Sequence, residues 1–492
     1  MARVSSIYHH IQAHTPVDGP GLLPGGDALP DDGFAADGAR RRVPGAADSM
    51  TNQPIFLVQS PEEVSSIVEA LVNLSHRPSA RSRRHLEAVI RGRRCIRLID
   101  PLVEAVRAEG RIDQGTLYPE LRRLLMETHW RETAKLCIAL LGLYRRKEDV
   151  DLLYTFARHE EFTLFAAVAL GNILPDPVPT WLALARQLRG WGKVHLVNRL
   201  VKHADVEEVR QWLLRFGCAN TVDDNLNAYA IATHCRLHAA LAAEQVDSDL
   251  LEGARRILNG LVEAGPAPGL EAYEEGPLAC LLWVRAMEGR TSRLSEFLTI
   301  SNLLQWMEEP DHTWPTDLTE ELRERMLRIL RDPSWRALAL ERLEHPDPAE
   351  AWTAREAARR LELPVFERLL PRLAADTTDV ALWAYLAAGA DRPALEQLLA
   401  LPLPPGGDVL SILLRALRRH PGLGAYLILK GLAHEEAACR LLALDVLGRW
   451  PVYCVLPELA LRVMELTRDD PLGVVRKAAR GVLKGWKMPG GQ

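Results

Sequence analysis

Short helical segments interrupted at close intervals are the feature that most limits what this chain can fold into. From residue 60 to residue 488, apolar residues recur three and four positions apart, and Ala, Leu, Glu and Arg dominate, as in amphipathic helices. Pro and Gly interrupt the pattern so often that each helix is about 10–16 residues long. The alternating β-branched residues typical of strands are almost absent. We therefore expect an all-α chain of short helices joined by short polar loops.

One helix-face pattern recurs: a polar residue, a small residue three positions later and an apolar residue seven positions later. Clear copies are Arg336, Ala339 and Leu343; Arg440, Ala443 and Leu447; and Arg476, Ala479 and Leu483; looser copies are Ala134, Cys137 and Leu141; and Thr163, Ala166 and Leu170. The small residue lets a neighbouring helix approach, and the large one fills the remaining gap. Successive copies lie 36 residues apart (440 to 476) or 29 apart (134 to 163). Such spacings are typical of stacked helix pairs.

Two of the clear copies resemble the core motif of HEAT repeats. In one, Asp332-Pro333 precedes Trp335-Arg336, and in the other Asp470-Pro471 precedes Val475-Arg476. The resemblance implies a right-handed α-solenoid of stacked antiparallel helix pairs, HEAT-like or armadillo-like. In that family a loop Asp and a helix Arg form a hydrogen-bonded ladder between adjacent repeats. By resemblance this structural role goes to Asp332, Arg336, Asp470 and Arg476, and to Arg440, which matches only the helix half of the motif.

Composition and motif quality divide the chain into three parts. Residues 16–45 are rich in Pro and Gly and have few periodic apolar residues, so we expect residues 1–50 to be disordered. A helix start follows Met50 closely, and an alternative is that translation begins at this Met. The repeat pattern is degenerate over residues 51–310 and clearest over residues 311–492, which we expect to be HEAT-like repeats.

Charge and cysteine usage limit the class of protein. The net charge of −5 argues against attraction of the whole molecule to nucleic acid or anionic membranes. The seven Cys are scattered without a CxxC pair, which favours buried thiols in a reducing compartment. No apolar run approaches the ~18 residues needed to span a bilayer, and the N-terminus lacks the apolar stretch of a secretory signal. We expect a cytoplasmic protein.

Recognisable catalytic motifs are not found in the sequence. It contains no phosphate loop, GxSxG elbow, HExxH motif, EF-hand run or zinc-finger spacing. We therefore predict no catalytic residues, no cofactor and no metal ligands. His234 and His238 would lie one turn apart on a continuous helix, a geometry that can bind a metal. Such pairs are common by chance, and a polar helix surface is the favoured interpretation.

Two polar stripes are candidates for a ligand groove. Trp191, His195 and Arg199 fall four positions apart, and Asn225 and Tyr229 form a second stripe further along the chain. An aromatic ring beside a guanidinium could bind a ligand by stacking and by a charged fork. The alternative is an amphipathic helix whose Trp packs between two repeats.

A cluster of Arg residues is a candidate surface for an anionic partner. Residues 77–97 contain eight Arg and a single acid, Glu87. Such a cluster can bind an acidic protein surface or nucleic-acid phosphates, with strongly salt-dependent affinity. A solvated face is the alternative interpretation. The residues that we single out are Arg81, Arg84, Arg91 and Arg94.

Three functions remain open. The first is a non-enzymatic scaffold or adaptor, because helical-repeat arrays expose a long surface that suits protein partners. The second is a nucleic-acid-binding protein similar to the HEAT-like glycosylases that act on alkylated bases, which use a basic concave face with Trp, Asp and Arg. The third is a HEAT-like small-molecule enzyme or lyase, as among the relatives of phycobilin lyases, although fold resemblance assigns no chemistry. The sequence leaves the partner and the oligomeric state open.

Overall fold

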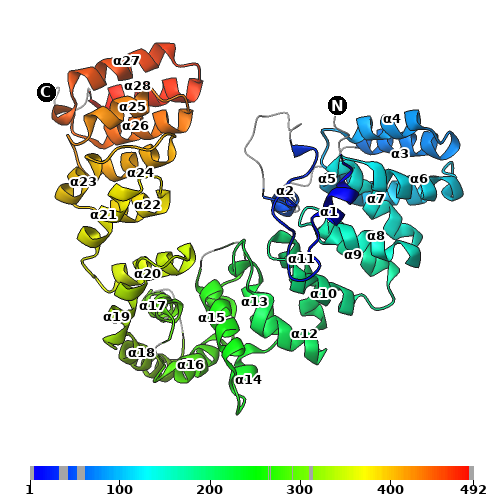
Figure 1. Cartoon of the computed structure of the whole chain (residues 1–492), viewed down its shortest axis with the longest axis horizontal. Coiled ribbons are helices and arrows are strands. Elements are labelled where there is room, and N and C mark those ends of the chain that lie inside the picture. Colours follow the sequence, from blue (N-terminus) through cyan, green and yellow to red (C-terminus); the bar gives the residue numbers. More distant parts are fainter. Residues whose placement is uncertain are drawn as a thin grey trace. The chain divides into compact units, whose positions relative to one another are not determined.

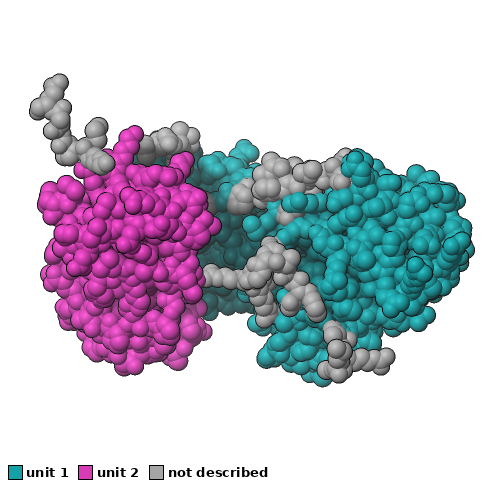
Figure 2. All heavy atoms as spheres, turned by 90° about the horizontal axis from the view of Figure 1, so that it is seen from above, with its two compact units in different colours: residues 1–332 teal, residues 333–492 magenta. Residues whose placement is uncertain are grey.

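The chain folds into α-helices. The computed structural model describes residues 5–32, 43–51, 61–263, 265, 267–290, 292–309 and 314–486, and these residues contain 28 α-helices and no β-strand (Figure 1). The all-α prediction is therefore confirmed. The helices group into two compact units, residues 1–332 and 333–492 (Figure 2). The division falls between Asp332 and Pro333.

Unit 1 contains the first eighteen helices in chain order. They are α1 (Ile7–Ala13), α2 (Ala46–Thr51), α3 (Pro61–His76), α4 (Ala80–Ile90), α5 (Cys95–Ala108), α6 (Gln114–Glu127), α7 (Arg131–Tyr144), α8 (Val150–Ala157), α9 (Thr163–Ile173), α10 (Val178–Gln187), α11 (Trp191–Leu200), α12 (Glu207–Trp212), α13 (Asn225–His234), α14 (Leu237–Leu241), α15 (Ser248–Val262), α16 (Gly276–Met287), α17 (Leu294–Met307) and α18 (Thr316–Leu330).

Unit 2 contains the remaining helices. They are α19 (Ser334–Arg342), α20 (Pro348–Arg360), α21 (Phe366–Ala375), α22 (Val380–Ala388), α23 (Arg392–Leu399), α24 (Asp408–Leu417), α25 (Ala425–Leu432), α26 (Ala437–Arg449), α27 (Pro457–Asp469) and α28 (Gly473–Trp486). Six of the seven cysteines of the chain are buried, and Cys454 is half-buried. Across the described part of both units, no helix is long and apolar enough to cross a membrane.

Many of these helices begin where an Asp side chain caps them. Five Asp carboxylates accept backbone N–H groups of the first turn, which otherwise have no partner within the helix: Asp113, Asp247, Asp347, Asp379 and Asp391. In α20 and α23 a Pro also lies in the first turn, where its missing N–H does no harm. The frequent Asp and Pro residues therefore mark helix starts as well as loops.

Helices pack against their neighbours in the chain and against the helix two places further on. In unit 2, α25 packs on α26, α27 packs on α28, and α26 contacts both α24 and α28 (Figure 1). In unit 1, α7 and α9 approach so closely that a Cβ on Gly142 would lie 2.9 Å from the Ala169 Cβ. The small residues Ala443 and Ala479 are fully buried. This packing of neighbouring pairs fits a helical-repeat arrangement.

Two stretches near the N-terminus are folded onto unit 1. Helix α1 packs against α6 and α8, and its Ile7 and Ile11 are fully buried. The disorder expected for residues 1–50 is therefore corrected for residues 5–32 and 43–51, while the rest of that range lies outside the described residues. Local composition misled because contacts of these stretches, such as those of α1 with α6 and α8, are made with residues far along the chain.

Candidate functional site

Three helices of unit 1 that begin near one another bind the N-terminal residues. Helices α7 and α9 pack together, as do α9 and α11. Their N-terminal ends and the loop before α9 supply five side chains that contact residues 31, 32 and 45–49 or support that contact. We call these five residues the docking surface: Arg131, Lys135, Glu160, Glu161 and His195.

Lys135 is the charged centre of the docking surface. It is fully buried, and its Nζ lies 2.5 Å from Asp48 Oδ2, 2.7 Å from Glu161 Oε1 and 3.2 Å from Glu132 Oε1. Burial opposes the charged form of Lys135, but the three surrounding carboxylates outweigh it and hold its pKa well above the ordinary value. Lys135 is therefore a buried cation that ties α2 to α7.

The two carboxylates nearest to Lys135 titrate differently. Burial raises the pKa of Asp48 to about 6, although Lys135 acts in the opposite direction. Burial also works to raise the pKa of Glu161, but Lys135, Arg131 and the backbone N–H of Gly45 together lower it to about 2. Glu161 is therefore the permanent anion of the docking surface, whereas Asp48 belongs to the N-terminal segment and is more easily protonated.

Arg131 holds a second acidic stretch of the N-terminal segment. Its Nη2 lies 2.8 Å from Asp31 Oδ1 and also pairs with Asp32, and its backbone N–H donates to Asp31 Oδ2 at 3.0 Å. The same guanidinium lies 3.8 Å from Glu161. Two cations on α7 thus pair with acids on either side of residues 33–42 in the sequence. Arg131 pairs with Asp31 and Asp32, and Lys135 pairs with Asp48.

Gly45 passes close to the loop before α9. Its N–H donates to Glu161 Oε2 at 2.8 Å, and a Cβ at this position would lie 2.6 Å from the backbone oxygen of Glu160. Its φ of +77° also favours glycine. Glu160 in turn accepts the N–H groups of Arg189 and Gly190 at 3.0 and 2.7 Å, at the start of α11. The segment therefore crosses the docking surface with its backbone in direct contact.

His195 anchors the end of the segment. The Ser49 hydroxyl donates to the Gly45 carbonyl at 2.7 Å, and His195 Nε2 lies 2.7 Å from the same Ser49 Oγ. Ser49 Oγ is therefore hydrogen-bonded to both the Gly45 carbonyl and His195 Nε2, and the second contact joins α2 to α11. Burial and then Arg199 lower the pKa of His195 to about 4. The Ser–His pair is arranged as an anchor.

The residues of the first predicted stripe lie close together in the structure. The residues of the second stripe do not join them. The Trp191 and His195 rings lie 6.5 Å apart, and Arg199 donates to the His195 carbonyl at 3.2 Å. Asn225 is buried and Tyr229 is half-buried on α13, and neither has a hydrogen bond to that first stripe. Instead Asn227, which the stripe pattern passed over, donates to Asn198 Oδ1 on α11 at 2.9 Å.

The predicted Arg patch is spread over three positions. Arg81 and Arg84 are exposed on α4, the Arg91 guanidinium lies 3.9 Å from the Trp130 ring centre, and half-buried Arg94 precedes α5. Two neighbours are neutralised: Arg83 lies 2.6 Å from Glu120 and Arg93 lies 3.4 Å from Glu63. The local excess of positive charge is therefore smaller than the sequence suggests.

In unit 2, three of the ladder residues meet. Arg440 makes a two-pronged ion pair with Asp470, Nε to Oδ2 at 2.7 Å and Nη2 to Oδ1 at 3.2 Å, and both side chains are buried. Arg476 donates to the Asp470 carbonyl. These contacts connect α26 with the loop before α28. Arg336, by contrast, is exposed on α19.

The His234–His238 pair does not have the geometry expected of it. Helix α13 ends at His234, and Arg236 adopts a left-handed φ of 53° before α14 begins. The His238 ring lies 3.3 Å from the Tyr273 hydroxyl, and the His234 ring contacts the Ala230 carbonyl at 2.9 Å. The expectation of two imidazoles one turn apart on one helix is corrected by this break.

The central residues of the docking surface were missed at the sequence level. Lys135 carried one signal, because it is a lone charge inside the apolar run TAKLCIALLG. A charged residue within an apolar run is either exposed on a polar stripe or buried and paired. Lys135 is fully buried, so it must be paired. Glu161 and Asp48 carried no such signal, since their partners lie far away in the sequence.

Replacing His195 with Gln is expected to reduce the acid sensitivity of unit 1. The folded pKa of His195, about 4, lies below its ordinary 6.5, so the unfolded chain binds more protons in this window and stability falls as pH is lowered through it. At pH 5 this amounts to roughly 1–2 kcal/mol relative to pH 7. Gln keeps a donor for Ser49 but does not titrate.

The measurement is the difference between wild type and His195→Gln in melting temperature at pH 7 and pH 5. The two chains must be compared because other groups also change the stability at low pH. Buried His159, with a pKa lowered to about 4, adds to the loss of stability in acid, whereas Asp48, with a raised pKa, counteracts it. Equal acid-induced shifts in the two chains would show that His195 is not buried as a neutral group.

Comparison with known proteins identifies no family. No family model matches the chain, and no curated protein matches it. A crystal structure described as that of an engineered protein matches at 16% identity, over 87% of this chain and 100% of that chain, with a TM-score of 0.28. A TM-score this low does not establish a common fold.

Proposed function

We propose that this protein is a non-enzymatic scaffold whose docking surface binds acidic stretches of polypeptide. The observation that carries the proposal is that the surface already holds Asp31, Gly45 and Asp48 of its own chain, through two cations and a backbone hydrogen bond. A surface that recognises one acidic segment by charge and backbone contacts can recognise others with the same pattern.

The geometry defines the chemistry of the occupant. Arg131 takes a pair of acids, Lys135 takes a third acid, and Glu161 accepts one backbone N–H. Glycine suits the position that passes Glu160. A partner segment with two acids, followed at a distance by a Gly and then by an acid three residues later, would satisfy the same groups. An acid at that last position would join Glu161 and Glu132 around the buried Lys135, as Asp48 does.

The proposal includes a right-handed, HEAT-like solenoid in the cytoplasm. Packing of neighbouring helix pairs, buried small residues on the repeat stripe, and the contact of Arg440 on α26 with Asp470 in the loop before α28 support the repeat assignment. Protein partners are favoured over nucleic acid because Glu160, Glu161 and Glu132 would repel phosphates at the docking surface. The pairing of Arg83 and Arg93 with acids also weakens the basic patch.

Affinity isolation from the cells that make this protein tests the proposal. Three tagged chains are compared: the full chain, a chain beginning at Met50, and the Met50 chain with Arg131→Ala. We expect partners to be recovered best by the Met50 chain, because its docking surface is uncovered, and to be lost with Arg131→Ala. Circular dichroism confirms beforehand that the shortened chains are helical. Arg97→Ala, a change of an exposed Arg, is the control. Identical recoveries from all chains would contradict the proposal.

A further inference from the structure

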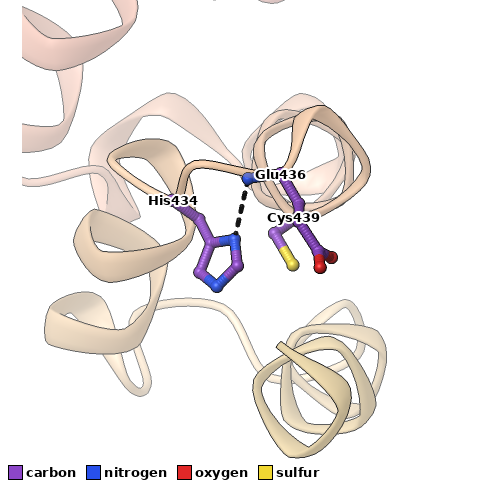
Figure 3. Close-up of side chains that lie close together, drawn as sticks. All are labelled: His434, Glu436 and Cys439. Atoms are coloured by element: carbon purple, nitrogen blue, oxygen red, sulfur yellow. Dashed lines mark hydrogen bonds between the residues drawn. The ribbon is translucent and has the colours of Figure 1, made fainter. Parts of the chain in front are cut away.

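Three potential metal ligands converge in unit 2. His434 lies in the loop before α26, Glu436 immediately precedes that helix, and Cys439 lies in its first turn. One ligand atom of each, a ring nitrogen, a carboxylate oxygen and the thiol sulfur, lies within 4.8 Å of the other two (Figure 3). In the described part of the chain, no other group of three or more His, Cys, Asp or Glu residues meets this condition.

We propose that His434, Glu436 and Cys439 form a binding site for a divalent transition metal of the zinc class. Imidazole nitrogen, carboxylate oxygen and thiolate sulfur are the ligands that zinc takes in proteins. A thiolate and a carboxylate neutralise the two positive charges of the ion. Three protein ligands leave a fourth tetrahedral position for water or for a ligand from another molecule.

A glycine keeps the space between the three ligands open. A Cβ on Gly407 would lie 3.1 Å from Cys439 Sγ, 3.2 Å from Glu436 Oε2 and 3.2 Å from His434 Cε1. The φ of Gly407 is −93°, which any residue can adopt, so the backbone does not require glycine here. A side chain at position 407 would instead fill the hollow among the three ligands.

The loop that carries two of the ligands is held rigidly. Arg440 Nη1 donates to the carbonyls of His434 and Glu435, each at 2.7 Å, while its other nitrogens pair with Asp470. Arg440, itself paired with Asp470, therefore holds the backbone of the metal-binding loop in place. Hydrogen bonds of this kind commonly orient the residues that bind a metal. Cys439 is buried, His434 is half-buried and Glu436 is exposed, so the hollow opens to solvent on the Glu436 side.

Metal binding requires two local changes. In the absence of metal, His434 Nδ1 accepts the N–H of Glu436 at 3.1 Å. A half-turn of the ring would place Nε2 where Cε1 now faces the hollow, at the loss of one hydrogen bond. The Cys439 thiol, 3.4 Å from Ser411 Oγ, loses its proton to solvent as the sulfur–metal bond forms, so binding releases one proton and strengthens as pH rises. Ligand atoms around tetrahedral zinc lie about 3.3–3.7 Å from one another. Small side-chain rotations would bring the three ligand atoms of this site to such separations.

Titration of the full-length protein with Co²⁺ tests the site, because a thiolate–cobalt bond gives a charge-transfer absorption band. We expect one Co²⁺ per chain, a thiolate band, and displacement of Co²⁺ by Zn²⁺. Glu436→Gln, an exposed change that leaves folding intact, is expected to weaken binding by roughly 10–100-fold, and Gly407→Ala by a similar factor although it keeps all three ligands. Cys439→Ser is expected to abolish the band.

Cys454→Ser is the matched control, since Cys454 is a half-buried thiol of the same unit; it is expected to bind as wild type. Melting curves in the absence of metal show whether each variant is folded. The proposal is overturned if the wild type gives no thiolate band, if the band survives in Cys439→Ser, or if Gly407→Ala and Glu436→Gln both bind as tightly as wild type.

Discussion

Replacing Lys135 with Met is expected to lower the free energy of unfolding of unit 1 by about 3–5 kcal/mol, since it breaks a buried ion pair by removing one partner. Met fills most of the same volume, so the loss arises from charge and not from a cavity. Asp48 and Glu161, exposed by only 2% and 5%, would be left without the cation that they share. We also expect residues 43–51 to detach from the docking surface, because the Asp48 carboxylate, once it has lost Lys135, is more stable in water than buried.

Differential scanning calorimetry measures the first effect, and limited proteolysis with N-terminal sequencing measures the second. Lys202→Met is the control, because Lys202 is an exposed lysine of the same unit and its change is expected to alter stability by less than ~0.5 kcal/mol. A Lys135→Met protein with wild-type melting and an uncut N-terminal segment would show that Lys135 does not hold the segment.

Replacing Arg440 with Met is expected to destabilise unit 2 by a similar amount, about 3–5 kcal/mol. Arg440 satisfies the buried carboxylate of Asp470 with two nitrogens and the carbonyls of His434 and Glu435 with a third. Met cannot make any of these bonds, so a buried carboxylate and two carbonyls lose their partner. Burial works to raise the pKa of Asp470, but the Leu472 N–H and then Arg440 hold it below its ordinary value, so this pKa is expected to rise in the variant.

Arg415→Met is the matched control, because Arg415 is exposed on α24 of the same unit. Urea unfolding, followed by the fluorescence of Trp450 and the other Trp residues, reports the stability. An unchanged midpoint in Arg440→Met would mean that the Arg440–Asp470 pair contributes nothing net, as some buried pairs do when water replaces the missing partner.

The helical architecture could be predicted from the sequence because its causes are local. Asp caps, Pro at helix starts and apolar residues at three and four positions apart act within one or two turns, as at Asp347-Pro348 before α20. The small residues of the repeat stripe, such as Ala443, are buried as the pattern implied. The unit boundary at Asp332-Pro333 could not be placed, because a loop within a unit and a loop between units look alike in sequence.

The candidate site could be predicted only in part. The four-residue spacing of Trp191, His195 and Arg199 predicted that they share one helix, but nothing in it indicated Ser49 as the partner of His195. The N-terminal segment was misjudged for the same reason. Its order depends on contacts such as Gly45 to Glu161, which are 116 residues apart, and composition reports only what a segment can bury by itself.

Binding of a labelled peptide of residues 5–51 to the chain beginning at Met50 tests the docking surface most directly. Fluorescence anisotropy should show saturable binding that weakens with added salt, because screened charges contribute to it. Binding should also weaken in the Arg131→Ala variant, while the full chain, whose surface is occupied, should bind the peptide far less. The same weak binding by the full chain, the Met50 chain and its Arg131→Ala variant would contradict a docking surface for acidic segments.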